Sequence, residues 1–152
     1  MVIVQNHTIA LDNKKRILVV DDELDICIML KVVLENNGFL IDYYYNAILA
    51  LNEFKSNFYN LIILDIQMPD INGLQLCREI RKKDKKVKIC FLTASESLFD
   101  TSNEFAEVYT LIKKPIENNN LIRIVNGLLN NWWLKQLETV YIINSSIYLH
   151  NY

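Results

Sequence analysis

The chain has 152 residues, which is room for one domain of ordinary size with short extensions. Hydrophobic residues make up 51% of it and charged residues 22%, a balance that excludes an intrinsically disordered chain. Sixteen basic residues against eighteen acidic ones give a formal net charge of −2. This near balance argues against a dedicated nucleic-acid-binding protein, so no direct DNA binding is expected.

The sequence also carries no sign of a membrane or secreted protein. No apolar run approaches the roughly 18 residues that a membrane span requires, and the first basic residues follow the N-terminal apolar stretch, the reverse of a signal peptide. Its three cysteines, Cys27, Cys77 and Cys90, are odd in number and widely spaced, which predicts reduced packing residues. We therefore expect a cytoplasmic protein without a disulfide framework or a zinc site.

Four short apolar runs rich in β-branched residues predict strands that are covered on both faces, as in a parallel sheet. After an extension over residues 1–15, they occupy residues 17–20, 61–64, 87–92 and 108–112, and residues 39–45 form a weaker candidate.

Between the runs, apolar residues recur with the period of a helix. The predicted helices cover residues 23–37 (ended by Gly38), 46–58 (with Ile48, Leu51, Phe54 and Phe58 on the apolar positions), 73–83, 95–104 and a last segment after Pro115 with apolar residues from Leu121 to Trp132. Strands that alternate with amphipathic helices predict an α/β fold, a doubly wound five-stranded parallel sheet flanked by five helices, over residues 16–130.

Polar side chains stand at the ends of the four apolar runs. The run at 17–20 is followed by Asp21-Asp22-Glu23, the run at 61–64 by Asp65, the run at 87–92 by Thr93 and the run at 108–112 by Lys113-Lys114-Pro115. Because ligands bind outside the carboxyl ends of parallel strands, we expect these groups to meet in one site.

The acids of this site predict a divalent cation. Neighbouring carboxylates repel one another, and one would normally be protonated unless a cation intervened. Mg²⁺ takes oxygen ligands from carboxylates and keeps several waters, so Asp21, Asp22, Asp65 and a backbone carbonyl near Gln67 are candidate ligands.

Thr93 and Lys114 indicate phosphoryl chemistry beside that cation. Phosphoryl transfer needs positioning and neutralisation of charge, which a lysine and a hydroxyl can supply. Asp65, placed centrally, is the natural nucleophile for an aspartyl phosphate.

These residues resemble the receiver domain of two-component response regulators. The matching segments are ILVVDDE at 17–23, LDIQMPDING at 64–73, LTA at 92–94 and KP at 114–115, within a resemblance that covers roughly residues 16–129. It implies a flavodoxin-like fold and a switch in a phosphorelay, in which Asp65 accepts a phosphoryl group from a histidine kinase or phosphotransfer protein.

The resemblance also assigns roles to single residues. It implies Mg²⁺ held by Asp21, Asp22, Asp65 and the Gln67 carbonyl, and phosphate contact by Lys114 next to a cis bond to Pro115. Thr93 would move toward the phosphate and reposition an interaction surface. Lys114 is preferred to Lys113 because it directly precedes the proline.

One position departs from the family pattern. Receivers usually carry Tyr or Phe three residues before the phosphate-contacting lysine, and here that residue is Leu111, with Tyr109 two residues earlier. The switch coupled to Thr93 is then expected to be weakened or to act through bulk. A degenerate receiver, acting as an interaction module without phosphorylation, is therefore an alternative.

A second alternative is an enzyme, an aspartate-nucleophile phosphatase of the haloacid dehalogenase type. That family requires a second Asp two residues after the nucleophile, and here Gln67, which cannot transfer protons, occupies that position. We therefore expect a signalling phosphoacceptor and no conventional enzyme.

Two further segments stand apart from this chemistry. Residues 81–88 are strongly basic, and a solvated loop is expected there in preference to a nucleic-acid-binding patch.

Residues 131–152 form an aromatic tail, which is too short for a DNA-binding effector domain. The tail is expected to continue the last helix to about Leu137 and then form a hairpin around residues 144–146. The tail would pack back on the domain or dock a partner, and a homodimer could form through the last helix or through the tail.

Overall fold

The computed structural model describes residues 14–94, 110–130 and 141–142. Its strands form one parallel sheet in the order β2-β1-β3-β4-β5-β6. The strands are β1 (Arg16–Val20), β2 (Leu40–Tyr44), β3 (Leu61–Asp65), β4 (Lys88–Thr93), β5 (Thr110–Lys113) and β6 (Tyr141–Ile142). The helices are α2 (Leu24–Glu35), α3 (Ala47–Glu53), α4 (Gly73–Lys83) and α5 (Asn118–Asn130).

The predicted α/β architecture is confirmed. All five predicted strands are present, and each pairs in parallel with its neighbours in the sheet. Four of the five predicted helices are seen, while the helix predicted over residues 95–104 lies outside the described residues. The two-residue strand β6 extends the sheet beyond β5. This pairing favours a tail that packs back on the domain, and the predicted hairpin around residues 144–146 also lies outside the described part.

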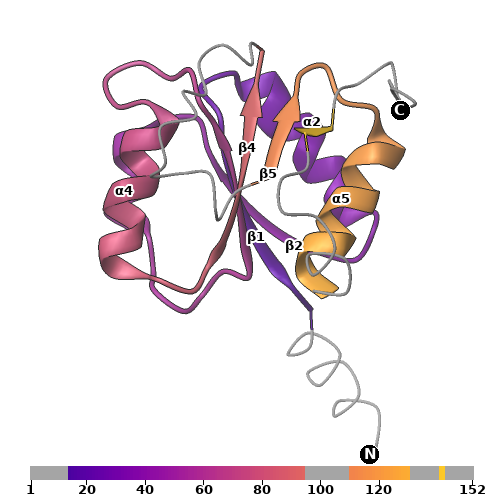
Figure 1. Cartoon of the computed structure of the whole chain (residues 1–152), viewed down its shortest axis with the longest axis horizontal. Helices are drawn as coiled ribbons and strands as arrows, with labels where there is room; N and C mark the ends of the chain where they lie inside the picture. Colours follow the sequence, from indigo (N-terminus) through magenta and orange to yellow (C-terminus); the bar gives the residue numbers. More distant parts are fainter. Residues whose placement is uncertain (1–13, 95–109, 131–140, 143–152) are drawn as a thin grey trace, which may run out of the picture.

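The core has two layers because successive side chains of a strand point to opposite faces of the sheet. Leu18 and Val20 of β1 pack in one cluster with α3 and α4, whereas Ile17 and Val19 pack in the other with α2 and α5. Figure 1 shows the same arrangement, with α4 on one side of the sheet and α2 and α5 on the other.

The helix predicted over residues 46–58 is wrong in length and in its buried face. Asn46 caps α3 with a side-chain oxygen that accepts a hydrogen bond from the Leu49 N–H, and the extended backbone of Phe54 ends the helix. Ile48 and Phe58 are 44% and 42% exposed. The buried residues are instead Ala47, Ala50 and Phe54, which pack in the core cluster that contains Leu18 and Val20 of β1.

Two other local predictions hold, namely the end of the first helix at Gly38 and the burial of the cysteines. Gly38 follows α2 with φ of +90°, a conformation that glycine adopts readily, and so closes the helix as expected. All three cysteines are buried thiols. Within the described residues, no helix combines the length and the apolar character needed to cross a bilayer.

Candidate magnesium and phosphoacceptor site

The candidate site lies at the carboxyl edge of the sheet, at the upper end of the strands in Figure 1. Asp21 follows β1, Asp65 ends β3, Thr93 ends β4 and Lys114 follows β5. The parallel register aligns these ends, since Asp65 is paired with Leu92 and Thr93 with Lys113. The structure thus brings together the strand-end residues that the sequence singled out.

Three carboxylates form the acidic part of the site. Asp21, Asp22 and Asp65 each offer one oxygen, and these oxygens all lie within 4.8 Å of one another. Asp21 is fully buried and Asp65 is 3% exposed, while Asp22 is open to solvent. A set of carboxylate oxygens with one exposed member fits a hard divalent cation such as Mg²⁺, which retains part of its water shell.

Lys114 is the cation that the fold itself supplies to this cluster. Its ammonium nitrogen lies 2.6 Å from Oδ2 of Asp21, 3.0 Å from Oδ1 of Asp65 and 3.5 Å from Oε1 of Glu23. This geometry favours Lys114 over Lys113 as the phosphate-contacting lysine. The peptide bond to Pro115 is cis, as the resemblance implied.

The pKa values of both Asp65 and Lys114 are raised by their surroundings. Burial, helped by the nearby charges of Asp21 and Asp22, raises the pKa of Asp65 to about 6 against the opposing effect of Lys114. Burial by itself lowers the pKa of Lys114, but hydrogen bonds from its ammonium to Asp21 and Asp65 outweigh burial and raise it. Among the described residues, one ammonium faces the carboxylates of Asp21, Asp22 and Asp65 with Glu23 beside them, which leaves excess negative charge that a divalent cation would neutralise.

The loop that follows Asp65 is held by a close backbone approach. A Cβ atom on Gly73 would lie 2.1 Å from the carbonyl oxygen of Asp65, a distance that no side chain tolerates. The Gly73 N–H donates to the carbonyl of Ile66 at 2.9 Å. Asn72 and Gln75 then form a reciprocal capping box that starts α4. Position 73 therefore requires glycine, because the backbone at the start of α4 lies directly against the backbone carbonyl of Asp65.

Three other predicted residues lie close to the cluster. Thr93 is fully buried, and its carbonyl accepts a hydrogen bond from the Lys114 N–H at 2.7 Å, which ties the ends of β4 and β5 together. Gln67 is exposed two residues after Asp65, and its carbonyl stays a predicted ligand. Leu111 is 5% exposed and pairs with Phe91, so its side chain belongs to the core. Tyr109 lies outside the described residues.

Two contacts were not anticipated from the sequence. Glu23, quoted only as part of an acidic triplet, contributes a carboxylate near Lys114 and also donates its backbone N–H to Oδ1 of Asp21 at 2.9 Å. The Cys27 thiol donates to the carbonyl of Asp21 at 3.2 Å. A helical turn places both residues over the end of β1, and the spacing from Asp21 could have indicated them.

A doubly wound parallel sheet with this acidic cluster, a strand-end threonine and a lysine before a cis-proline defines a phosphoacceptor module of the receiver class. The model of the response regulator receiver domain matches residues 17–126. The chain belongs to this family.

Two staphylococcal relatives agree with this membership. The response regulator ArlR of Staphylococcus haemolyticus is 34% identical over 116 residues, and that of Staphylococcus aureus strain Mu50 is 35% identical over 117 residues. The matches cover 74% and 75% of this chain but 52% of each relative. The chain therefore spans about half the length of these relatives.

Solved structures agree in fold. The response regulator TrrA of Thermotoga maritima, crystallised with Mg²⁺-BeF, is 43% identical and superposes with a TM-score of 0.67, over 76% of this chain and 99% of that one. CheY4 of Vibrio cholerae, at 21% identity and a TM-score of 0.69, covers 76% of this chain and 99% of its own, and it shows the fold alone.

Proposed function

We propose that the chain is a phosphorylation-dependent switch in which Asp65 accepts a phosphoryl group from a histidine kinase. The observation that carries this proposal is the meeting of Asp21, Asp22, Asp65 and Lys114 at one edge of the sheet. The similarity to TrrA, whose structures include one with Mg²⁺-BeF and one in complex with the histidine kinase ThkA, supports it. The work of the chain would then be signalling in the cytoplasm, without turnover of an external substrate.

The chemistry follows from the contacts. An oxygen of the Asp65 carboxylate forms a bond to phosphorus as the bond between phosphorus and the donor's imidazole nitrogen breaks. Lys114, already 3.0 Å from Asp65, would move its contact to a phosphoryl oxygen and neutralise charge there. Asp21, Asp22 and Asp65 would hold Mg²⁺, which when bound supplies further neutralisation of the phosphoryl oxygens.

The direct test uses a small phosphodonor and no kinase. The purified chain is incubated with acetyl phosphate, with and without Mg²⁺, and its intact mass is measured. We expect one phosphoryl adduct that requires Mg²⁺ and that is absent in Asp65→Asn. Asp70→Asn, which changes an exposed acid in the same loop, should retain the adduct. No adduct in the unchanged chain would support the alternative of a degenerate receiver.

The kinase would dock beside the site, on the exposed face of α2. Leu24, Ile28 and Val32 repeat at the helical spacing of i, i+4 and i+8 and are 42%, 44% and 51% exposed. The stripe begins directly after the acidic residues at the end of β1. An apolar ridge next to the phosphoacceptor suits an apolar helical face of a partner.

A second measurement separates docking from chemistry. Ile28→Glu is expected to slow phosphotransfer from a phosphorylated histidine kinase at least about 10-fold, because a charge would be buried in the contact. Its phosphorylation by acetyl phosphate should be unchanged, since the residue does not contact the cluster. Leu49→Glu, an equally exposed apolar position on α3, is the matched control. Equal rates for both variants with the kinase would disprove docking on α2.

A further inference from the structure

A cavity lies at the end of the sheet opposite the acidic site. It has a volume of about 370 Å³ and is lined by Lys15, Asn57, Tyr59, Asn60, Asp84, Lys86, Val87, Lys88 and Leu129. Lys15 precedes β1, Asn60 precedes β3 and Lys88 begins β4. Because these strands are parallel neighbours, their amino ends meet here, so the cavity and the phosphoacceptor site share strands but not residues.

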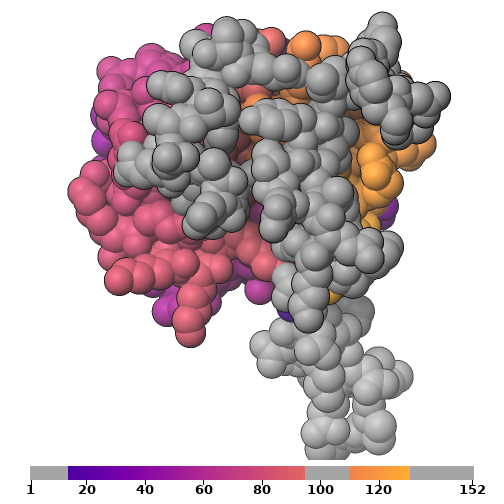
Figure 2. Space-filling model, viewed as in Figure 1, coloured from indigo at the N-terminus to yellow at the C-terminus, as the bar shows by residue number. Residues whose placement is uncertain are grey.

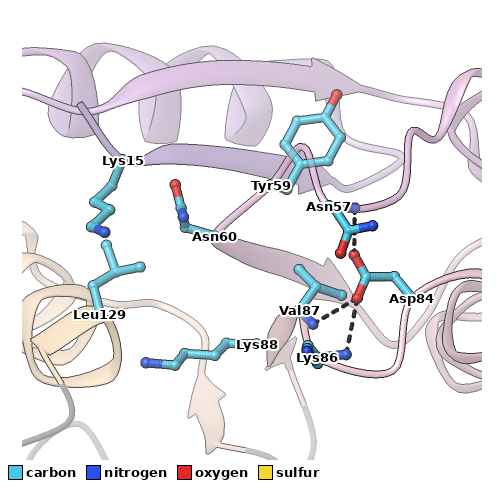
Figure 3. Close-up of a pocket in the computed structure, with 9 residues that line it drawn as sticks. All are labelled: Lys15, Asn57, Tyr59, Asn60, Asp84, Lys86, Val87, Lys88 and Leu129. Atoms are coloured by element: carbon cyan, nitrogen blue, oxygen red, sulfur yellow. Dashed lines mark hydrogen bonds between the residues drawn. The ribbon is translucent and has the colours of Figure 1, made fainter. Parts of the chain in front are cut away.

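The charge of the cavity is positive. Three lysines line it, against one carboxylate, Asp84. That carboxylate is already engaged, since its oxygens accept hydrogen bonds from the backbone N–H groups of Asn57, Lys86 and Val87 at 2.8, 2.9 and 3.0 Å. The dashed lines in Figure 3 mark these three bonds.

Two of the lysines lie on the same side of the cavity. Figure 3 shows the ammonium groups of Lys15 and Lys88 both near the end of α5 that carries Leu129. Burial lowers the pKa of Lys88, and the charge of Lys15 lowers it further, so the two ammonium groups are close enough to repel. Among the described residues, no salt bridge joins Lys15 or Lys86 to a carboxylate.

The surroundings strengthen this positive field. The last turn of α4 and the loop to β4 carry Lys82, Lys83 and Lys85, all exposed. Lys82 pairs with Glu79 and Lys83 donates to the carbonyl of Leu51, so within the described residues no carboxylate neutralises Lys83 or Lys85. Figure 2 shows the salmon-coloured segment of this region projecting at the lower end of the molecule, away from the upper, acidic end of the strands. The net charge of the chain is therefore close to zero although the carboxyl edge of the sheet is acidic and its amino edge is basic.

We propose that this cavity, formed by Lys15, Lys86 and Lys88 around Asn60 and Leu129, binds a small polyvalent anion such as a phosphate ester or a diphosphate. Lys88 has a second role, because its ammonium donates to the carbonyl of Leu128 at the end of α5. Capping of α5 accounts for Lys88 alone. It does not account for two further lysines placed around the same cavity, whereas a ligand with several negative oxygens does.

The test is a titration with inorganic pyrophosphate in EDTA, followed by backbone NMR of the full chain. EDTA removes divalent cations, so that the acidic site, which repels anions, does not take the probe. We expect saturable shifts of the amides of Asn60, Val87 and Lys88 and none at Ile66. Lys15→Ala and Lys86→Ala, both at exposed positions that leave the fold intact, should each weaken binding at least about 10-fold.

The matched control is Lys85→Ala, since Lys85 is exposed in the same loop and does not line the cavity. It should change the affinity less than about two-fold. Equal weakening by all three variants would show that the probe senses only the general field of the basic edge. That result, or shifts that do not saturate, would overturn the proposal. Neither result would bear on phosphorylation of Asp65, which is measured separately by intact mass.

Discussion

The ammonium of Lys114 lies 3.0 Å from Oδ1 of Asp65 and 2.6 Å from Oδ2 of Asp21, so one lysine bridges two carboxylates that stand at the carboxyl ends of different strands. In the absence of a metal ion, this lysine is the cation that offsets the charge of the cluster.

Replacement of this lysine should make the fold depend on a divalent cation. Lys114→Met removes the ammonium that neutralises the buried carboxylates of Asp21 and Asp65 and is expected to lower the free energy of unfolding by about 2–4 kcal/mol in EDTA. Millimolar Mg²⁺ should restore more stability to the variant than to the unchanged chain, which urea denaturation in both conditions measures. Lys85→Met serves as the surface control. An equal response to Mg²⁺ in the variant and the unchanged chain would contradict the prediction.

Asp65 should reduce stability at neutral pH when no metal is present. Its pKa is raised from 3.8 to about 6 by folding, so the folded state holds its proton more tightly than the unfolded state. The unchanged chain therefore loses stability as the pH rises through this interval. Asp65→Asn, which carries no charge, is expected to be more stable by about 1–3 kcal/mol at pH 8 in EDTA.

The stability difference between Asp65→Asn and the unchanged chain should depend on pH. The advantage of Asp65→Asn should disappear as the pH falls below about 4, where the aspartic acid is neutral in both the folded and the unfolded state. Melting temperatures of both proteins from pH 3 to 8 check it. A stability difference that does not change with pH would show that the substitution acts through packing.

Gly73 and Gly38 should respond differently to alanine. Gly73→Ala forces a Cβ against the backbone carbonyl of Asp65 and is expected to cost about 3 kcal/mol or more and to slow phosphorylation. Gly38→Ala meets open space and strains only the positive φ, at a cost of about 1 kcal/mol, with the phosphorylation rate unchanged. Chemical denaturation and the acetyl phosphate assay test both. Unchanged phosphorylation in a folded Gly73→Ala protein would disprove the coupling.

Asp84 should stabilise the basic end through its hydrogen bonds. Burial raises its pKa, but the donors from Asn57, Lys86 and Val87 outweigh burial and hold the pKa below its usual value. Asp84→Ala leaves these donors without an acceptor and is expected to cost about 2–3 kcal/mol at pH 7. Asp84→Asn can keep the acceptor shared by Lys86 and Val87, so it should cost about half as much.

The contribution of Asp84 has the opposite pH dependence to that of Asp65. A lowered folded pKa means that the stabilisation is complete above the unfolded pKa, near 4, and is lost as the pH falls through the folded value. The difference between Asp84→Ala and the unchanged chain should shrink in acid, as measured by denaturation between pH 3 and 7. A difference that grows in acid would contradict the assignment.

The elements of this protein and their order could be predicted from local sequence patterns. Apolar runs and helical periods are local properties, so they located all five strands and the helix from Gly73 to Lys83 at its observed bounds. The rule that parallel strands present their carboxyl ends together also identified Asp21, Asp65, Thr93 and Lys114 as neighbours.

How closely these residues approach one another, and which side chains are buried, depends on the packing of the folded chain. It placed Ala47 and Ala50 of α3 in the core while Ile48 is exposed, because the face that a short helix turns toward the sheet depends on how the helix packs against other segments. It brought Gly73 against the Asp65 carbonyl and gathered Lys15, Lys86 and Lys88 around one cavity. Contacts between segments far apart in the chain depend on packing across the whole sheet, whereas the periodicity of a strand or a helix depends only on its own residues.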